Sequence, residues 1–276
     1  MNRTMHVLLG LALLLGAAAV QASPEEDRLK VVELFKSRYP DVKFENYIYG
    51  ALAFDPDSKA QYDSLMEFPP FVGEIEKGQK LWNTPFKNGK TYADCLPNGG
   101  KMIAGNYPMF DEAKGQVVTL EDAVNACRVA NGEDPYKLDD MKTMGLLMAY
   151  ARTLSDGMKM NIKVTGPAAL KAFEDGKKTY YGRKGQLNFS CANCHIDHAI
   201  DRLRSELLSP VIGQATHWPV FRGGDNLVSL QKRYTGCFNS VRQVSEKEGS
   251  VRLNNLEYFH AYLSNGLELK ASVLRK

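Results

Sequence analysis

Two segments in the second half of the chain carry apolar side chains at the spacing of an α-helix. The first begins after Thr165-Gly166-Pro167, a helix-start signal with proline at the first helical position. Its apolar positions are Leu170, Phe173 and Tyr180. The second is a stripe that ends near Gly266 and contains Leu256, Phe259, His260 and Leu263. The pattern predicts two amphipathic helices at either end of a region that is otherwise mostly loops.

A different pattern marks the N-terminus, where Arg3 precedes a run of apolar residues from Val7 to Val20. Residues 20–22 fit a small-residue cleavage site, so we expect a signal peptide at residues 1–22. An uncleaved anchor is the alternative, but the run is short for a spanning helix, which needs about 20 residues. No later run is long enough to span a membrane. We therefore expect a soluble mature protein in an oxidising compartment, most simply the bacterial periplasm.

The composition is that of a folded protein with a modest charge. Of the 276 residues, 44% are hydrophobic, and the formal net charge is +3. So small a charge does not indicate a nucleic-acid partner. The cysteines are Cys95, Cys127, Cys191, Cys194 and Cys237. Because their number is odd, an exported protein would retain one thiol that needs an explanation.

The segment from Cys191 to His195 reads Cys-Ala-Asn-Cys-His, the attachment signature of haem c. Its spacing lets two thiols form thioethers to the porphyrin while the adjacent imidazole reaches the iron. A redox dithiol or half of a zinc site is the alternative, but the chain has no second Cys-x-x-Cys. We therefore expect one covalently bound haem c, held by Cys191 and Cys194, with His195 as an iron ligand.

The first half of the chain repeats the second. In each copy a proline stands nine residues before a glycine, Gly78 or Gly176. Three pairs of segments correspond: 69–82 with 167–180, 118–127 with 228–237, and 147–154 with 259–266. The repeat predicts an all-α fold of two tandem cytochrome-c-like domains. We place an N-terminal extension at residues 23–68, a first domain at residues 69–157 and a haem-binding domain at residues 158–276.

The first copy lacks the haem signature. Residues 95–99 read Cys-Leu-Pro-Asn-Gly, so Asn98 replaces the second thiol and Gly99 replaces the iron ligand. In the repeat, Cys95 matches a haem-attachment cysteine and Cys127 matches Cys237, so the two should approach each other where a haem would otherwise lie. We predict a Cys95–Cys127 disulfide there. Two buried free thiols are the alternative, which an oxidising compartment disfavours.

The second axial ligand of the iron has few candidates. All ten methionines lie within the first 160 residues, so none follows the haem-attachment motif. His198 is three residues from His195 and cannot easily cross to the other haem face. His260 belongs to the apolar stripe and corresponds to Met148 of the first copy, which favours a packed core histidine. His217 and Cys237 remain as candidates.

We favour the Cys237 thiolate over His217, because Cys237 is the unpaired cysteine and the repeat places it opposite the haem-attachment turn. A thiolate lowers the iron potential and is itself reactive toward sulfur. Arg233 precedes Cys237 by four residues and could reach the same pocket from a helical turn. Its guanidinium group could there form paired hydrogen bonds with an oxyanion. Lys232 and Arg242 also flank the cysteine, and for Lys232 a solvated surface charge is the better interpretation. The segment indicates a thiol that receives an anionic sulfur compound.

Three motifs together resemble the SoxA family, the catalytic cytochromes of bacterial thiosulfate oxidation. They are residues 189–195, Phe-Ser-Cys-Ala-Asn-Cys-His; residues 216–222, Thr-His-Trp-Pro-Val-Phe-Arg; and residues 230–242, in which Arg233 and Cys237 form an Arg-x-x-x-Cys element. The third motif is the most specific. Because the first domain lacks its haem motif, the chain resembles the single-haem variety, in which a disulfide occupies the vacant site.

The resemblance implies an L-cysteine S-thiosulfotransferase that joins the sulfane sulfur of thiosulfate to a cysteine of the carrier protein SoxYZ. Two electrons then pass through haem c to a soluble cytochrome. It implies that Cys237 is both the distal ligand and the persulfide-bearing catalytic sulfur. It also implies that Arg233 binds the substrate sulfonate, with Arg242 a second candidate for that charge. A small cytochrome, SoxX, would complete the enzyme as a heterodimer, and residues 23–68 could clasp it.

Two other functions stay open at this point. The main alternative is a periplasmic electron-transfer cytochrome without sulfur catalysis, with His217 as the sixth ligand and Cys237 as a buried thiol. The other is a haem peroxidase or ligand sensor, which would need an iron site that is open or easily vacated.

Overall fold

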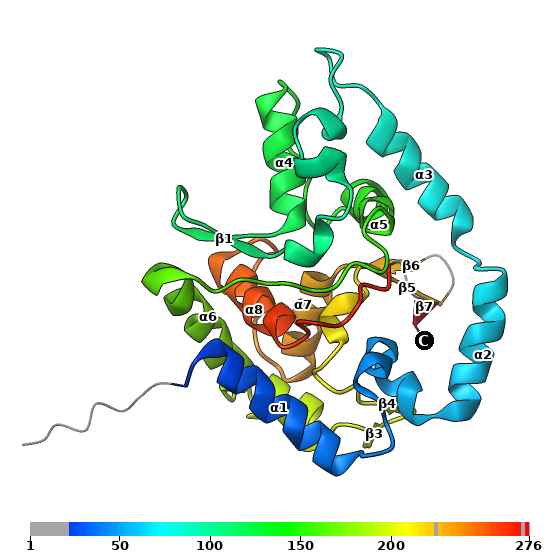
Figure 1. Cartoon of the computed structure of the whole chain (residues 1–276), viewed down its shortest axis with the longest axis vertical. Helices are drawn as coiled ribbons and strands as arrows, with labels where there is room; N and C mark the ends of the chain where they lie inside the picture. Colours follow the sequence, from blue (N-terminus) through cyan, green and yellow to red (C-terminus); the bar gives the residue numbers. More distant parts are fainter. Residues whose placement is uncertain (1–21, 224–225, 272–273, 276) are drawn as a thin grey trace, which may run out of the picture.

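The computed structural model describes residues 22–223, 226–271 and 274–275 of the chain, arranged mainly as helices (Figure 1). The predicted signal peptide, residues 1–22, lies outside the described residues except for Ala22. In the part of the chain that is described, no helix combines the length and the apolar character needed to cross a membrane.

The N-terminal extension forms three helical segments. Its elements are α1 (Pro24–Arg38), the 3-10 helix η1 (Phe44–Phe54) and α2 (Pro56–Glu67). Helix α1 begins where its sequence signals it: Ser23 and Glu26 form a reciprocal capping box, and Pro24 occupies the first turn. Phe35 of α1 is completely buried, so this helix is part of the core of the protein and not a loose arm.

The first half of the remaining chain runs from residue 72 to residue 153. Its elements are α3 (Val72–Asn83), η2 (Tyr92–Asp94), η3 (Pro97–Gly100), η4 (Ala104–Asn106), β1 (Met109–Asp111), β2 (Gln116–Val118), α4 (Leu120–Ala130), the π-helical turn η5 (Met141–Gly145) and α5 (Leu146–Thr153). Thr119 and Asp122 cap α4 reciprocally. The cap fixes the start of the helix that carries Cys127.

The second half repeats the order of a helix, a hairpin and two further helices, and it contains additional short strands. It contains α6 (Gly166–Tyr181), the π-helical turn η6 (Asn193–Asp197), β3 (Arg202–Leu203), β4 (Glu206–Leu207), η7 (Gln214–Thr216), β5 (Val220–Arg222), β6 (Asn226–Val228), α7 (Leu230–Ser240), α8 (Val251–Tyr262) and β7 (Leu274–Arg275). The two helices predicted from the apolar stripes are α6 and α8. Their pairing is the most extensive between any two elements, as expected for the first and last helices of the unit.

The fold is mostly helical, as predicted, and a few short strands accompany the helices. An antiparallel hairpin precedes each of the 11-residue helices α4 and α7, formed by β1 with β2 and by β5 with β6. Strand β7 adds to β5 in parallel, and β3 pairs with β4. These strands are only two or three residues long, too short to show the alternation of apolar and polar residues by which a strand is predicted.

The same close helix crossing occurs in both halves. A Cβ atom added to Gly78 of α3 would lie 2.1 Å from the carbonyl oxygen of Leu146 in α5. A Cβ atom added to Gly176 of α6 would lie 2.0 Å from the carbonyl oxygen of Asn255 in α8. Only glycine allows such an approach. The two glycines that mark the repeat in the sequence are therefore the points where the paired helices cross.

These crossings correct the alignment of the last helices. The added Cβ atoms would also meet Cβ of Tyr150 at 3.0 Å and Cβ of Phe259 at 2.9 Å, so Tyr150 corresponds to Phe259. His260 therefore corresponds to Ala151, and its pairing with Met148 was wrong by three residues. The shared Ala-Tyr dipeptide suggested the wrong register, because a short identity weighs little against the contact that fixes how two helices pack.

The first half is closed by the predicted disulfide. Cys95 and Cys127 are bonded, with their Cα atoms 5.9 Å apart and a sequence separation of 32. The prediction is confirmed, and the alternative of two buried free thiols is wrong. A single hydrophobic cluster continues from this region into the N-terminal extension and the second half, with Phe35, Trp82, Val124 and Phe259 among its members.

Candidate functional site

The motif from Cys191 to His195 lies on a short helical segment that its own residues start. The amide of Asn193 donates to Oγ of Ser190 at 3.2 Å, and the amide of Ser190 donates to Oδ1 of Asn193 at 3.0 Å. This reciprocal cap begins a turn that continues into η6. Because the turn is helical, it brings the two thiols and the imidazole of the motif into one neighbourhood.

The ring of His195 is held through one nitrogen. Nδ1 donates to the carbonyl oxygen of Ser209 at 2.8 Å. The side-chain amide nitrogen of Gln214 donates to the same oxygen and lies 2.7 Å from Nδ1. Burial lowers the pKa of His195, and the charge of Arg233 lowers it further, against the hydrogen bond with Ser209. The ring is therefore neutral, with Nε2 available as a metal ligand.

Cys237 lies close to the two thiols of the motif. Burial raises the pKa of Cys191 to about 11, opposed by the charge of Lys184 and reinforced by that of Cys237. Burial and then Cys237 raise the pKa of Cys194 in the same way. All three cysteines are free and half-buried. In the first half, by contrast, the cysteines that correspond to Cys191 and Cys237 are joined in a disulfide.

A buried hydroxyl beside these thiols lacks a partner. Tyr180 of α6 is 1% exposed, and its hydroxyl makes no hydrogen bond within the described part of the chain. Burial raises its pKa, and charges on Cys191, Tyr181, Cys237 and Cys194 raise it further, so the hydroxyl lies within electrostatic reach of the three sulfurs. Buried polar atoms normally have partners. These groups fit haem c, the cofactor of a cytochrome c domain. They are two thiols beside a neutral imidazole, a third sulfur and a hydrogen-bond donor without a partner.

The charged residues predicted near Cys237 are placed differently from one another. Arg233 lies on α7 one turn before Cys237, as predicted, with an exposed side chain that still acts on the pKa of His195. Lys232 is exposed, as expected for a surface charge. Arg242 lies beyond the end of α7, in left-handed backbone with φ of 59° and an exposed side chain. Among the described contacts, none joins Arg242 to the sulfur cluster.

Two of the other histidines occupy the surroundings expected for structural roles. His198 is exposed, and its Nδ1 lies 2.9 Å from Oδ2 of Asp201, so it is a surface histidine as predicted. His217 is 5% exposed, and its ring stacks on Trp218 with the centroids 5.6 Å apart.

His260 is packed in the core, as the sequence indicated. It is 2% exposed, its Nδ1 lies 2.7 Å from the hydroxyl of Tyr234, and burial lowers its pKa to about 3. Tyr180 and Tyr234, whose ring centroids lie 5.7 Å and 5.8 Å from that of His260, were not predicted as site residues. Tyr234 precedes Cys237 by three residues, a spacing that puts both on one helix face and could have indicated it. Tyr180 sits in an apolar stripe, where nothing distinguishes a functional tyrosine from a packing one.

Comparison with known proteins decides the family. A relative from Chlorobaculum tepidum, named L-cysteine S-thiosulfotransferase subunit SoxA, is 41% identical over 257 residues, which cover 93% of this chain and 89% of the relative. The chain belongs to the SoxA family. A SoxA subunit from Allochromatium vinosum with the same name is also 41% identical, over 98% of this chain and 96% of its own. The resemblance inferred from the three motifs is thus confirmed.

Two further matches connect the SoxA family to the fold. The family model described as SoxA/TsdA, cytochrome c domain, matches residues 77–160. This segment runs from α3 to beyond α5 and includes the disulfide, so the match falls on the half without the haem signature. The crystal structure of SoxXA from P. pantotrophus aligns with a TM-score of 0.71 and 31% identity, covering 79% of this chain and 84% of that one.

Proposed function

We propose that this SoxA-family protein is the catalytic subunit of an L-cysteine S-thiosulfotransferase, with its active sulfur on Cys237. The observation that carries the proposal is the convergence of Cys237 with the motif thiols Cys191 and Cys194 beside a neutral, hydrogen-bonded His195. The names of the relatives, which match nearly the whole chain, support this reaction.

Each residue of the cluster has a distinct task. Cys191 and Cys194 would hold the haem covalently, and His195, through Nε2, and Cys237 would ligate its iron. The haem provides a one-electron acceptor beside the reacting sulfur. Arg233, exposed one turn from Cys237, binds the sulfonate of thiosulfate and so brings its sulfane sulfur toward that thiolate.

The overall reaction balances in atoms and charge. The thiol of a SoxYZ-like carrier protein loses its proton, one sulfur–sulfur bond forms between the carrier cysteine and the sulfane sulfur of thiosulfate, and two electrons leave. They pass one at a time to two equivalents of a soluble cytochrome, each of which is reduced by one electron. The hydroxyl of Tyr180, buried beside the three sulfurs, excludes water from them and supplies a hydrogen-bond donor.

We further propose that the chain contains two tandem cytochrome-c-like domains and one haem. The recurrence of the glycine crossings and the match of a cytochrome c family model to residues 77–160 support the first point. The Cys95–Cys127 disulfide supports the second, because it uses the thiol that would attach a haem in the first domain. A haem-to-protein ratio near one, measured from the pyridine haemochrome spectrum, is expected; a ratio near two would contradict this assignment.

A small SoxX-like cytochrome is the proposed subunit partner, since the similar crystal structure is that of SoxXA. We propose the periplasm as the location, based on the N-terminal apolar run and on the disulfide. The clasp for SoxX predicted at residues 23–68 stays a prediction. The described contacts of α1 and η1 are with the second half of their own chain.

The decisive experiment is low-temperature electron paramagnetic resonance of the oxidised protein beside Cys237→Ser and His217→Ala. We expect a low-spin thiolate signal that is lost in Cys237→Ser and kept in His217→Ala. Thiosulfate-dependent reduction of a cytochrome in the presence of a carrier protein should be lost only in Cys237→Ser. A bis-histidine signal that changes only in His217→Ala, with normal turnover by Cys237→Ser, would instead identify an electron carrier.

A further inference from the structure

The N-terminal extension contacts the segment that carries the predicted haem ligand. Nη1 of Arg38, the last residue of α1, donates to the carbonyl oxygen of Ile196 at 2.6 Å and lies 3.4 Å from that of Asp197. The hydroxyl of the next residue, Tyr39, donates to the carbonyl oxygen of Ala199 at 2.9 Å. All three acceptors lie within four residues of His195, at the end of η6 and just beyond it.

These carbonyl oxygens are of the kind that needs an external donor. The last carbonyl groups of a helix have no partner within the helix, and a positive charge at that end is favourable. Arg38 supplies both a donor and a charge at the end of η6. Tyr39 is itself fixed by aromatic packing, with its ring centroid 4.9 Å from that of Phe54 and 6.2 Å from that of Phe35. The donors are thus held in place before they meet the turn.

The extension also supports the other side of the imidazole. The amide of Ala51, in η1, donates to Oγ of Ser209 at 3.3 Å, and the carbonyl oxygen of Ser209 accepts from Nδ1 of His195. Nearby, a Cβ atom on Gly213 would lie 2.1 Å from the carbonyl oxygen of Tyr47, so η1 is packed tightly against this loop. Both the turn that carries His195 and the loop that orients its ring therefore rest on residues 38–51.

We propose that Arg38 and Tyr39 are positioning residues that fix the orientation of the His195 imidazole toward the iron. The inference rests on the proposed haem site. Hydrogen bonds around a metal ligand set its orientation and basicity, and here Arg38 and Tyr39 act through the backbone of the turn that carries the ligand. The extension would then tune the haem from outside the cytochrome fold.

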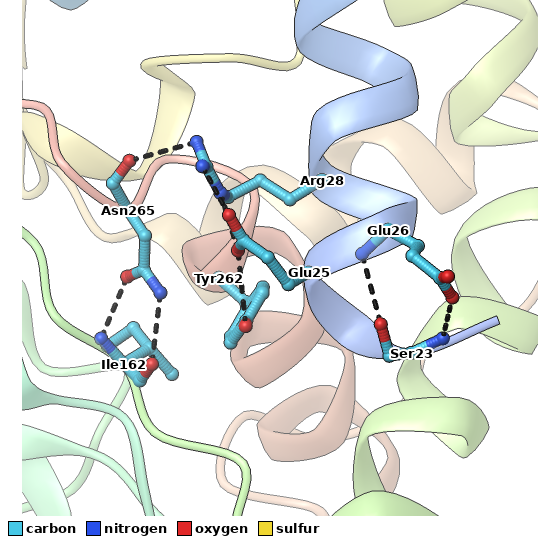
Figure 2. Close-up of polar contacts among 7 residues, drawn as sticks. All are labelled: Ser23, Glu25, Glu26, Arg28, Ile162, Tyr262 and Asn265. Carbon is cyan, nitrogen blue, oxygen red and sulfur yellow. Dashed lines mark hydrogen bonds and ion pairs between the residues drawn. The ribbon is translucent and has the colours of Figure 1, made fainter.

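The opposite end of α1 offers a matched control (Figure 2). There Arg28 ion-pairs with Glu25 and lies 3.4 Å from the carbonyl oxygen of Asn265, while the hydroxyl of Tyr262 lies 3.4 Å from Glu25. This cluster, too, joins α1 to the second half through an arginine and a tyrosine, although here the tyrosine belongs to α8. It is anchored at the loop after α8, not at the haem-attachment turn.

The test compares Arg38→Lys/Tyr39→Phe with the control Arg28→Lys/Tyr262→Phe and with wild type. Both double variants keep the net charge, so a removed charge cannot account for a change in potential. We expect Arg38→Lys/Tyr39→Phe to broaden the low-spin resonance lines and raise the haem reduction potential, because a looser imidazole donates less to the iron. The control should lose comparable stability in urea while keeping the wild-type resonance and potential.

Each outcome decides the matter. Wild-type lines and potential in Arg38→Lys/Tyr39→Phe, or equal changes in the control, would overturn the positioning role. If that double variant does not fold, Tyr39→Phe alone removes one hydroxyl and should shift both readouts in the same direction by less; no shift would overturn the proposal. A wild-type protein without covalent haem would instead refute the proposed function before any variant is compared.

Discussion

Removal of the Cys95–Cys127 disulfide should cost about 4 kcal/mol of stability. The bridge closes a loop of 32 residues, and the chain-entropy estimate for a loop of that length gives this magnitude. The variant Cys95→Ser/Cys127→Ala suits the two environments: Cys95 is exposed, whereas Cys127 is 5% exposed and would bury the hydroxyl of a serine.

Urea unfolding of this variant and of wild type, followed by tryptophan fluorescence and circular dichroism, measures the loss. Trp82 is a suitable probe because its ring stacks on Tyr92, which lies three residues before Cys95, with the centroids 5.1 Å apart. Since one hydrophobic cluster joins the two halves, we expect the transition of the whole protein to move to lower urea. Reduced wild type should unfold at the same urea concentration as the variant.

Two results would refute this reasoning. A loss below about 1 kcal/mol would mean that the unfolded chain gains little freedom when the loop opens. A changed haem absorption spectrum in the folded variant would mean that the disulfide-bridged half shapes the haem site directly, so that the loss of stability would not come from loop entropy alone.

Three further predictions concern binding, packing and pH. Arg233→Ala should raise the KM for thiosulfate at least tenfold in steady-state assays, whereas Lys232→Ala, the exposed neighbour, should leave it unchanged. Gly176→Ala should lower the free energy of unfolding, measured in urea, by about 1–3 kcal/mol or more, since its Cβ would lie 2.0 Å from a carbonyl oxygen. Gly73→Ala, which has open space around it, should raise the free energy of unfolding by up to about 1 kcal/mol. Burial raises the pKa of Glu257 to about 8, with the charge of a second carboxylate adding to it, so the folded protein holds this proton more tightly than the unfolded chain does. The free energy of unfolding should therefore fall as pH rises from about 4.5 to 8, and Glu257→Gln should reduce that fall; an equal fall in both proteins would contradict it.

Local spacing along the chain was enough to predict several features. The helical period predicted α6 and α8, and the repeat led to the Cys95–Cys127 disulfide. A repeat also predicts helix pairing, because its glycines mark where the helices cross. These features depend on residues close in sequence, or on a comparison of the chain with itself.

Other features were decided by packing between distant segments. The register of α8 depends on the atoms that face Gly176, so a sequence match misplaced His260 by three residues. The tyrosine hydroxyl among the sulfurs looks in sequence like any apolar helix position, and its role depends on what the fold brings beside it.

The sequence by itself determined the chemistry of this protein: the attachment turn, the unpaired Cys237 and the arginine one turn before it. Only the tertiary structure decided what holds that chemistry in place. Arg38 reaches Ile196 across 158 residues of chain, and no periodicity relates the two. The physical reason is that reactive groups are set by residue type and local spacing, whereas their orientation comes from hydrogen bonds and packing between segments that only folding brings together.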